Sequence, residues 1–491
     1  MSIIKPLQFV DKILDNVHGF IPYTKYEKEI IDCILFKRLQ SIKQLSTVDW
    51  VFPGSEHTRY IHSLGVMHIA DQIAMAIKLS DEERRIVRMA GLLHDIGHYP
   101  LSHVCEKPYE DEIEVIEGQF DCSKINKKIK RDIDQFTDKE MVTYMKKSNG
   151  YHHEKIGADI VLNDRKIREI VKQACGTKAP DIIADMIIGN VDSATTDPLL
   201  VQILHYELDA DGIDYLMRDA MFSGTSFGAF EVDQLIRCME FASFNEKNIL
   251  CINPKGIAAA DQYLINKFFS YSQVVFNKHV VISEFMTNQV IDWMKQHDKS
   301  FPSRKELTDW IKGPEMKSEY YDFTDIKYWT AVKNLLENSL SEIEPLFIKI
   351  FCQYLLRRQE LSCTGEVKCV STDPGTIKDV LQSSDIYKKL ESNDKDINIL
   401  LTRRMSKQVK SKRFEDLLNN TTIDTPSGSE PISEDDKNMH RERRLMDCIC
   451  VHDSGTIRPL CDDPRSIMQE IYNLNLAILR SYDGNIQEGI I

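Results

Sequence analysis

The apolar residues of the first three hundred positions recur at the three-to-four spacing of helices that bury one face. In RYIHSLGVMHIADQIAMAIKL, residues 59–79, this spacing is followed by Ile61, Leu64, Met67, Ile73 and Ile77. Strand-like alternation is rare between residues 25 and 300. The pattern predicts a mainly helical, all-α fold.

Breakers and caps place the ends of these helices. Pro53 and Gly54 interrupt the chain before the first helix. The next helix is predicted to begin near Ser80, with three acids in its first turn, and to end at Gly97 and Pro100. The run SGTSFG, residues 223–228, stops a third helix.

The pattern changes along the chain and suggests five regions. We expect an N-terminal segment over 1–50, a core over 51–300 with a charged insertion at 107–150, and a helical C-terminal lobe over 301–418. The Ser, Thr, Pro and acid content of 419–437 predicts a flexible linker. Residues 438–491 predict a small α+β region, in which a hairpin in MDCICVHDSGTIRPL precedes a last helix over PRSIMQEIYNLNLAIL, residues 464–479.

Composition narrows the class of protein. The chain has 62 Lys and Arg against 76 Asp and Glu, a net charge of −14, which argues against a nucleic-acid partner. Hydrophobic residues at 42% and charged residues at 28% are typical of a globular protein rather than a disordered one. The N-terminal stretch lacks a signal-peptide pattern, no long apolar run is present, and the cysteines are scattered. These features predict a cytoplasmic protein with reduced thiols and no membrane partner.

Histidines and carboxylates gather on three of the predicted helices. His94 and Asp95 are adjacent, His98 follows one turn later, and His62 lies one turn after Arg59. Asp211, Tyr215 and Asp219 recur every four residues as a polar stripe on an otherwise apolar helix. Imidazole and carboxylate are the usual ligands of a catalytic divalent ion.

Each residue alone also has a simple structural explanation. A lone histidine is more often hydrogen-bonded in a core, and an aspartate stripe is more often solvated or paired with an arginine such as Arg218. The joint pattern of one histidine, then a His-Asp pair, then an aspartate in a polar stripe favours a metal site.

These motifs resemble a known family. The segments FKRLQSIKQLSTVDWVFPGSEHTRYIHSLGVMHIADQI, LLHDIGHYPLSH, YHHE and LDADGIDYLMRDA are similar to the HD-domain phosphohydrolases, in particular the deoxynucleoside triphosphate triphosphohydrolase branch. The resemblance runs from residue 15 to about residue 300. It implies a mainly helical HD-domain fold and hydrolysis of a dNTP to deoxynucleoside and triphosphate.

The resemblance also implies roles for individual residues. The divalent metal, whether Mn, Fe, Zn, Co or Ni, would be held by His62, His94, Asp95 and Asp211, with Mg accompanying the substrate triphosphate. Catalytic and phosphate-contacting groups would be Arg59, His98, His103, Glu106, His153 and Glu154. Substrate would also contact Tyr215 and Asp219, while Gln44 and Leu45 would pack under the deoxyribose and exclude a 2′ hydroxyl.

Activated members of this family bind a nucleotide effector between subunits. The matching segment here, IIDCILFKRLQ, contains Asp32, Lys37 and Arg38, so the resemblance implies an allosteric site in residues 1–50 and a homo-oligomer, a dimer or a tetramer. Gln40 and Asp11 stand where cations are expected, and an effector other than guanine fits this departure. The biological setting, nucleotide homeostasis or phage defence, is left open by the sequence.

Two departures concern the catalytic site. Glu106 stands where an aspartate is expected to orient a histidine, and Gly212 replaces a basic residue that would contact phosphate. Two other readings are therefore kept beside the dNTP triphosphohydrolase. One is an HD phosphodiesterase or nucleotidase acting on another nucleotide or a nucleic-acid end. The other is a nucleotide-gated assembly module with vestigial catalysis.

Overall fold

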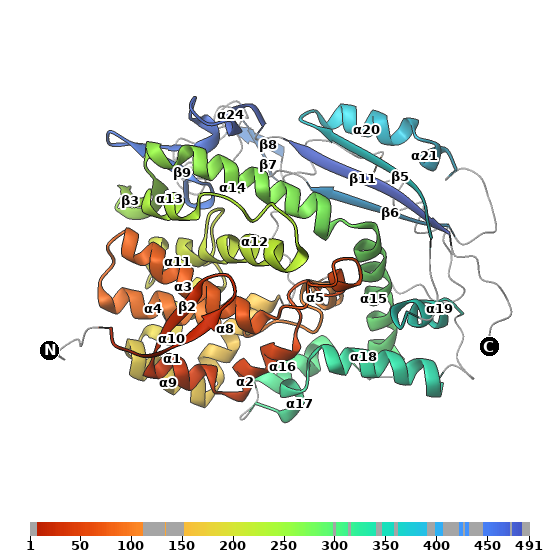
Figure 1. Cartoon of the computed structure of the whole chain (residues 1–491), viewed down its shortest axis with the longest axis horizontal. Coiled ribbons are helices and arrows are strands. Elements are labelled where there is room, and N and C mark those ends of the chain that lie inside the picture. Colours follow the sequence, from red (N-terminus) through yellow and green to blue (C-terminus); the bar gives the residue numbers. More distant parts are fainter. Residues whose placement is uncertain are drawn as a thin grey trace.

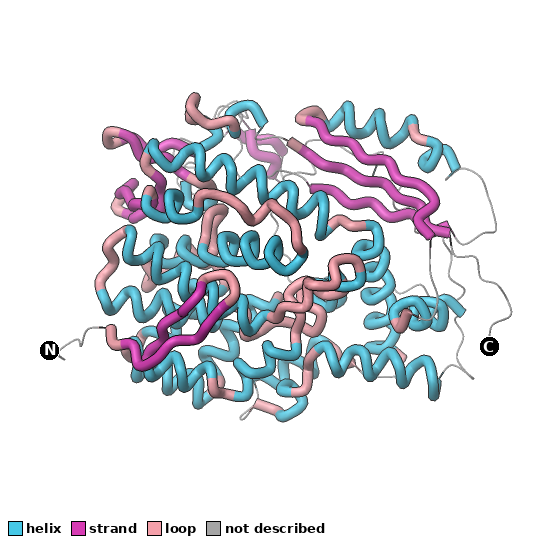
Figure 2. The backbone as a smooth tube through the Cα atoms, in the orientation of Figure 1, coloured by secondary structure: helices cyan, strands magenta, loops and turns pink. Residues whose placement is uncertain are grey.

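The molecule is built mainly from helices, with small sheets at its periphery (Figures 1 and 2). This confirms the predicted fold class. A computed structural model describes residues 7–110, 133, 152–297, 301–312, 316–339, 346–357, 362–389, 398–405, 422–425, 428–431, 445–471 and 474–483. Among the described helices, none combines the length and the hydropathy that crossing a bilayer requires.

Five helices form the centre of the structure, and local sequence explains where they start. The serine and glutamate side chains of a capping box at Ser80 and Glu83 open the second of them. The Asp209 carboxylate accepts the N–H of Gly212 at the start of the last one, which ends at Gly224 in the left-handed conformation with φ +71°. The five are α3 (Arg59–Ala76), α4 (Asp81–Leu93), α8 (His153–Asn163), α10 (Ala179–Ile187) and α12 (Ala210–Ser223).

Missing side chains let α3 approach its two neighbours closely. A Cβ on Gly65 would overlap the carboxylate of Asp214 on α12. A Cβ on Gly91 of α4 would lie 3.1 Å from the Cα of Met67 on α3. Glycine at these two crossings therefore lets the backbones of α3 and α4 meet directly and leaves room beside α3 for the Asp214 side chain of α12.

The remaining helices surround this centre or extend it (Figure 1). Helix α5 follows the HD motif and packs against the long α15, while α14 passes over α12. The bounds are α1 (Lys25–Ile31), α2 (Ile34–Lys37), α5 (His103–Glu110), α9 (Arg165–Cys175), α11 (Pro198–Leu204), α13 (Val232–Arg237), α14 (Ile257–Ser270), α15 (Lys278–Gln296), α16 (Arg304–Lys312), α17 (Ser318–Tyr321), α18 (Asp325–Asn334), α19 (Leu346–Leu355), α20 (Pro374–Ser383), α21 (Asp385–Lys389) and α24 (Met468–Ile471).

Four small sheets complete the architecture. A hairpin of β1 (Phe9–Asp15) and β2 (Gly19–Thr24) lies in front of the central helices in Figure 1. The order β10-β9-β4-β3 joins β3 (Met239–Phe244) and β4 (Lys247–Ile252) to β9 (Cys450–Asp453) and β10 (Thr456–Pro459). The order β5-β11-β6 joins β5 (Ser362–Ser371), β11 (Asn475–Asp483) and β6 (Asn398–Met405), and β7 (Thr422–Thr425) pairs with β8 (Gly428–Pro431).

The C-terminal region differs from the sequence-based expectation. The hairpin is confirmed as β9 and β10, which turn at Ser454 and Gly455. The last helix over 464–479 is wrong, because only α24 is helical and residues 475–483 form β11. This strand is hydrogen-bonded on both edges, and Leu476 and Leu479 are both fully buried. A short apolar run buried on both faces has no periodicity that separates strand from helix.

The predicted helical lobe over 301–418 holds only in its first part. Helices α16 to α19 occupy its described residues up to Leu355, but β5 and β6 then pair with β11 from the C-terminal region. The lobe and the C-terminal region therefore share one sheet. Within the predicted linker 419–437 the described residues form the β7–β8 hairpin. Most of the 107–150 insertion lies outside the described residues.

The turn after α4 offers a test of this packing. A Cβ on Gly97 would overlap His153 O and Gly157 N of α8, so Gly97→Ala should lower the free energy of unfolding by about 2 kcal/mol, as overpacking does. Urea unfolding measures the change. The matched control is Gly157→Ala in the same contact, where the nearest atom to a new Cβ is 3.4 Å away and little loss is expected. Equal stability of the two variants would contradict close packing at Gly97.

Candidate active site and metal centre

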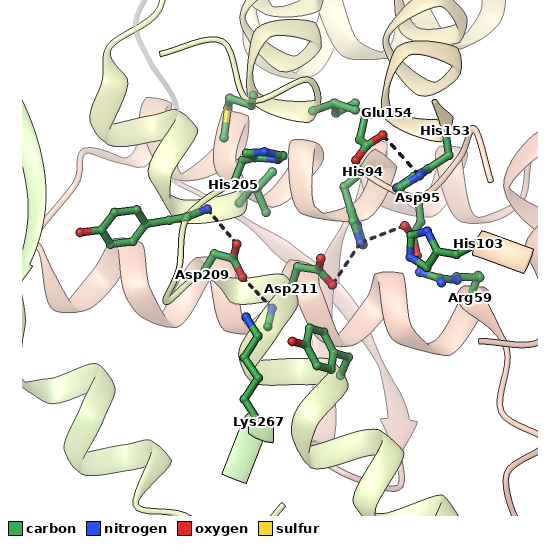
Figure 3. Close-up of a pocket in the computed structure, with 16 residues that line it drawn as sticks. Arg59, His94, Asp95, His103, His153, Glu154, His205, Asp209, Asp211 and Lys267 are labelled. Carbon is green, nitrogen blue, oxygen red and sulfur yellow. Dashed lines mark hydrogen bonds and ion pairs between the residues drawn. The ribbon is translucent and has the colours of Figure 1, made fainter. Parts of the chain in front are cut away.

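One pocket is lined by residues of α3, α5, α8, α10, α11, α12 and α14, together with His94 and Asp95 from the turn after α4 (Figure 3). It contains eight of the residues predicted from the sequence, together with others that were not. The predicted ones are Arg59, His94, Asp95, His103, His153, Glu154 and Asp211, to which Tyr215 is added from the proposed sugar contacts; Asp209 and Lys267 are new.

The four predicted metal ligands meet at one point. Nε2 of His62 lies 2.9 Å from Oδ1 of Asp211 and 3.7 Å from Oδ2 of Asp95. Nε2 of His94 lies 3.4 Å from Oδ1 of Asp95 and 3.9 Å from Oδ1 of Asp211. Nδ1 of His94 is paired with Gly91 O at 2.8 Å, while its buried Nε2 has no hydrogen-bond partner among the described residues. This unpaired nitrogen, directed at two carboxylates, fits a divalent cation.

A buried carboxylate behind these ligands fixes the ring of His62. Oδ2 of Asp214 lies 2.7 Å from Nδ1 of His62, and Oδ1 lies 2.5 Å from Nε2 of His18. Arg218 donates to both oxygens and also to Asp15. Burial would raise the pKa of Asp214, but Arg218 and the two histidines hold it well below its usual value. The ionised carboxylate directs Nε2 of His62 into the pocket.

Arg59 connects the metal ligands to the neighbouring loop. Its Nη1 donates to Oδ2 of Asp95 at 2.9 Å and its Nε donates to Oγ of Ser102 at 2.9 Å. Burial would raise the pKa of Asp95, yet Arg59 and the histidines lower it. The guanidinium is therefore held rigidly at the pocket wall, where its planar fork can face a phosphate.

Glu106 orients two histidines at once. Its Oε2 lies 2.8 Å from Nδ1 of His103 and its Oε1 lies 2.9 Å from Nδ1 of His153. The longer acid therefore reaches both rings and leaves Nε2 of each as the nitrogen that can exchange a proton. His98 stacks on His153 with ring centroids 4.0 Å apart, and burial lowers the pKa of His98 well below its usual value. His153 is also 3.3 Å from Glu154, and despite burial the two glutamates raise its pKa to about 10.

The predicted sugar contacts are less closely gathered. Tyr215 lines the pocket, whereas Asp219, one turn further along α12, is paired with Nε2 of His57 at 2.8 Å. Gln44 is buried, and its backbone carbonyl accepts from Nη2 of Arg59 at 3.5 Å. Leu45 packs against the hydrophobic core. The pocket wall, as described, does not include Asp219, Gln44 or Leu45.

The three residues of the predicted effector site are divided between surface and core. Asp32 and Lys37 are paired at 3.6 Å on the surface. Arg38 is buried instead, and its guanidinium donates to backbone carbonyls of the loop after α4 and of the segment before α18. Its bonds leave it no role at an exposed nucleotide site. An effector site at Asp32 and Lys37 stays a prediction, as does the oligomer.

A lysine from α14 faces the position where a basic residue was expected. Gly212 has no side chain, and a Cβ there would overlap Oη of Tyr263 on α14. Lys267, one turn beyond Tyr263, reaches the pocket wall beside Asp209 (Figure 3). Burial would lower the pKa of Lys267, but the surrounding tyrosines and carboxylates raise it above its usual value. The pocket therefore has a permanent cation at this wall.

Sequence reasoning missed Asp214, His18, His57 and Lys267. Asp214 lies off the four-residue stripe of its helix, and the other three reach the site through contacts between segments distant in sequence. The sequence held one signal, for Asp214: an acid on the apolar face of a helix requires a buried partner.

Comparison with known proteins finds an HD domain over the part of the chain that carries most of these residues. Residues 59–211 match the model of the HD domain, a range that begins at Arg59 and ends at the last metal ligand. The uncharacterized protein YwfO of Bacillus subtilis is 25% identical over 327 residues, covering 62% of this chain and 64% of YwfO, which is less than two thirds of that relative's length. The deoxynucleoside triphosphate triphosphohydrolase SAMHD1 of Homo sapiens is 40% identical over 99 residues, 19% of this chain and 16% of that enzyme.

Solved structures show the same fold over nearly the whole chain. A hypothetical protein from Aquifex aeolicus superposes with a TM-score of 0.59 at 20% identity, covering 96% of each chain. A phosphohydrolase from Bacteroides thetaiotaomicron gives the same score and identity, covering 96% of this chain and 99% of that one. The chain therefore contains an HD domain over residues 59–211 and is similar, over a larger part of its length, to HD-domain proteins that include deoxynucleoside triphosphate triphosphohydrolases.

Proposed function

We propose that this HD-domain protein cleaves deoxynucleoside triphosphates into deoxynucleoside and triphosphate. The observation on which the proposal rests is the distribution of charge in the pocket. A divalent-ion ligand set lies between Arg59 with its neighbouring imidazoles and, on another wall, Lys267. Cationic groups on separate walls suit a substrate with a chain of phosphates, and the SAMHD1 relatives are named for acting on such substrates.

Each group of residues at the site has a separate role in the proposed reaction. His62, His94, Asp95 and Asp211 would hold the ion, which when bound polarises phosphate oxygens and lowers the pKa of a water. Arg59 donates to phosphate oxygens and neutralises their charge. His103 and His153, kept in one orientation by Glu106, transfer protons between the attacking water and the leaving 5′ oxygen. His98 and Glu154 pack and pair with His153 and complete this group.

Selection for a deoxy sugar is assigned to the other side of Arg59. Asp219, oriented by His57, accepts the 3′ hydroxyl beside Tyr215, and Gln44 with Leu45 fills the space of a 2′ hydroxyl. The second candidate is a phosphodiesterase or nucleotidase acting on another nucleotide. It is favoured by one observation, that the pocket wall as described does not include Gln44, Leu45 or Asp219.

The products distinguish the two candidates. Purified protein is incubated with each dNTP and rNTP in the presence of Mn, Mg, Fe or Co, and the products are separated by ion exchange. Intact triphosphate and deoxynucleoside are expected, because Arg59 and the metal ligands gather at one end of the pocket, where the alpha phosphate would bind. Nucleoside monophosphate with pyrophosphate as the first products would favour the second candidate.

Metal analysis tests the ligand set. Asp211→Asn should lose the tightly bound ion and turnover while keeping its circular dichroism spectrum, since the Asp211 side chain is 38% exposed and packs little. Glu154→Gln is the matched control: it changes a carboxylate of the same pocket that we place outside the ligand set, so it should keep its metal. The reverse result would show that the ion binds beside Glu106, His153 and Glu154, a second group with suitable geometry.

Lys267→Gln tests recognition of the phosphate chain. Loss of a charge-assisted contact should raise KM for a dNTP about 10-fold or more. KM for bis-p-nitrophenyl phosphate, which has a single phosphate, should stay near the wild-type value. Lys255→Gln, an exposed lysine at the turn before α14, is the control. Equal effects of Lys267→Gln on both substrates would show that Lys267 does not contact the outer phosphates.

A further inference from the structure

A carboxylate outside the HD match is bonded to two loops of the active site. Asp325, the first residue of α18, is buried, with a relative exposure of 7%. Its Oδ2 accepts the N–H of Lys43 at 2.9 Å and its Oδ1 accepts the N–H of Leu101 at 2.6 Å. One side chain therefore ties two segments that are 58 positions apart, each directly before proposed active-site residues.

The loop at Leu101 needs such support. Leu101 and Ser102 both adopt the left-handed conformation, with φ of 51° and 55°, which residues other than glycine rarely adopt. The next residue is His103. Ser102 Oγ donates to Lys43 O at 2.6 Å and accepts from Arg59. The two loops are thus joined directly through Ser102 and a second time through Asp325.

The segment before α18 makes a further contact with the same loop. Arg38 donates through Nη1 to Phe323 O at 2.6 Å and through Nη2 to His98 O at 2.7 Å and Ile96 O at 3.1 Å. The hydroxyl of Tyr320 also accepts from Nη2. The turn that carries His98 is therefore bonded, through Arg38, to the chain leading to Asp325.

Helix capping does not account for Asp325. An aspartate in the first turn of a helix usually serves that helix through its dipole or its own N–H groups. Here both oxygens accept from N–H groups of other segments, and Thr324, the N-cap residue before α18, makes no side-chain capping bond. Burial raises the pKa of Asp325 to about 6, which shows that burying this carboxylate carries a desolvation cost. A residue that served only α18 would not need a buried carboxylate at this position.

We infer that Asp325 is a positioning residue of the active site, holding the Leu101–Ser102 turn that presents His103 against the Lys43 peptide that leads into Gln44 and Leu45. This inference rests on the proposed function only for the role of His103. An asparagine cannot replace the carboxylate, because one oxygen would become an NH₂ group facing an N–H donor. The link between the loops would then depend on the Ser102 hydroxyl and on Arg59, which donates to Ser102 and to the backbone carbonyl of Gln44.

The test compares Asp325→Asn with Asp261→Asn in the full chain. Asp261 is also buried and also accepts from a hydroxyl and a backbone N–H, those of Ser466 and Ile467, so it controls for the loss of a buried carboxylate. Hydrogen–deuterium exchange should rise in peptides that contain Lys43 and Leu101 only in Asp325→Asn. Exchange that matches the wild type there, or that rises evenly through the molecule, would overturn the inference.

The ratio of kcat on two substrates provides a second test, because a loss of stability would lower kcat on both substrates equally. In Asp325→Asn, kcat for a dNTP should fall about 10-fold or more with metal content retained, because His103 must protonate a poor leaving group. The loss should be smaller for bis-p-nitrophenyl phosphate, whose leaving group needs no proton. Equal losses on both substrates would overturn a role through His103.

A second variant keeps the inference testable if the first does not fold. Asp325→Glu retains two acceptor oxygens on a longer arm and should lie between wild type and Asp325→Asn in both exchange and kcat. A glutamate variant no better than the asparagine one in both readouts would count against the inference. If the wild type releases no deoxynucleoside from any dNTP, the proposed function fails, and the exchange result alone then decides whether Asp325 holds the loops.

Discussion

The buried carboxylate of Asp214 is the interaction on which the rest of the site depends. It lies where α3 and α12 cross, and a side chain at Gly65 would occupy its place. An ionised group in that position is tolerated only because Arg218, His18 and His62 surround it. The close crossing therefore requires the charge network, and the network in turn fixes the ring of His62 toward Asp211. The packing of α3 against α12 and the orientation of the His62 ring therefore depend on the same carboxylate.

Some site residues could be predicted from the sequence, and others depend on contacts between segments that are distant in sequence. His62 and Asp211 lie on α3 and α12, His94 and Asp95 lie in the turn directly after α4, and the structure brings all four close together. His98, His103, Glu106 and His153 also meet, though the reach of Glu106 to both rings follows only from the position of α8 relative to α5. Arg38 could not be placed, because a basic residue beside Lys37 on a short helix reads equally as surface or core. Its burial is decided by carbonyls from residues 96, 98 and 323.

Local signals predicted helix ends better than strand identity. The predicted start near Ser80 is confirmed by a capping box of Ser80 and Glu83, and the SGTSFG run contains the left-handed Gly224 that ends α12. Both depend on residues within one turn of each other. The central strand β11 depends instead on β5 and β6, whose paired residues lie about 70 to 120 positions earlier in the chain. No local pattern in NLAIL distinguishes a strand buried between two others from a buried helix.

The residues of the site come partly from the range that matches the HD domain and partly from segments before and after it. The metal ligands and the imidazole group all lie in or at the ends of residues 59–211, the range that matches the HD model. The groups proposed to contact the sugar and the outer phosphates lie outside it: Gln44 and Leu45 before, and Tyr215, Asp219 and Lys267 after. At Gly212, where a basic residue was expected, the pocket has Lys267 of α14 instead, so a cation lies at this wall although it comes from a segment beyond the HD match. The wall of one pocket is therefore drawn both from the HD match and from a helix that follows it, and the charge of that wall cannot be deduced from the HD residues by themselves.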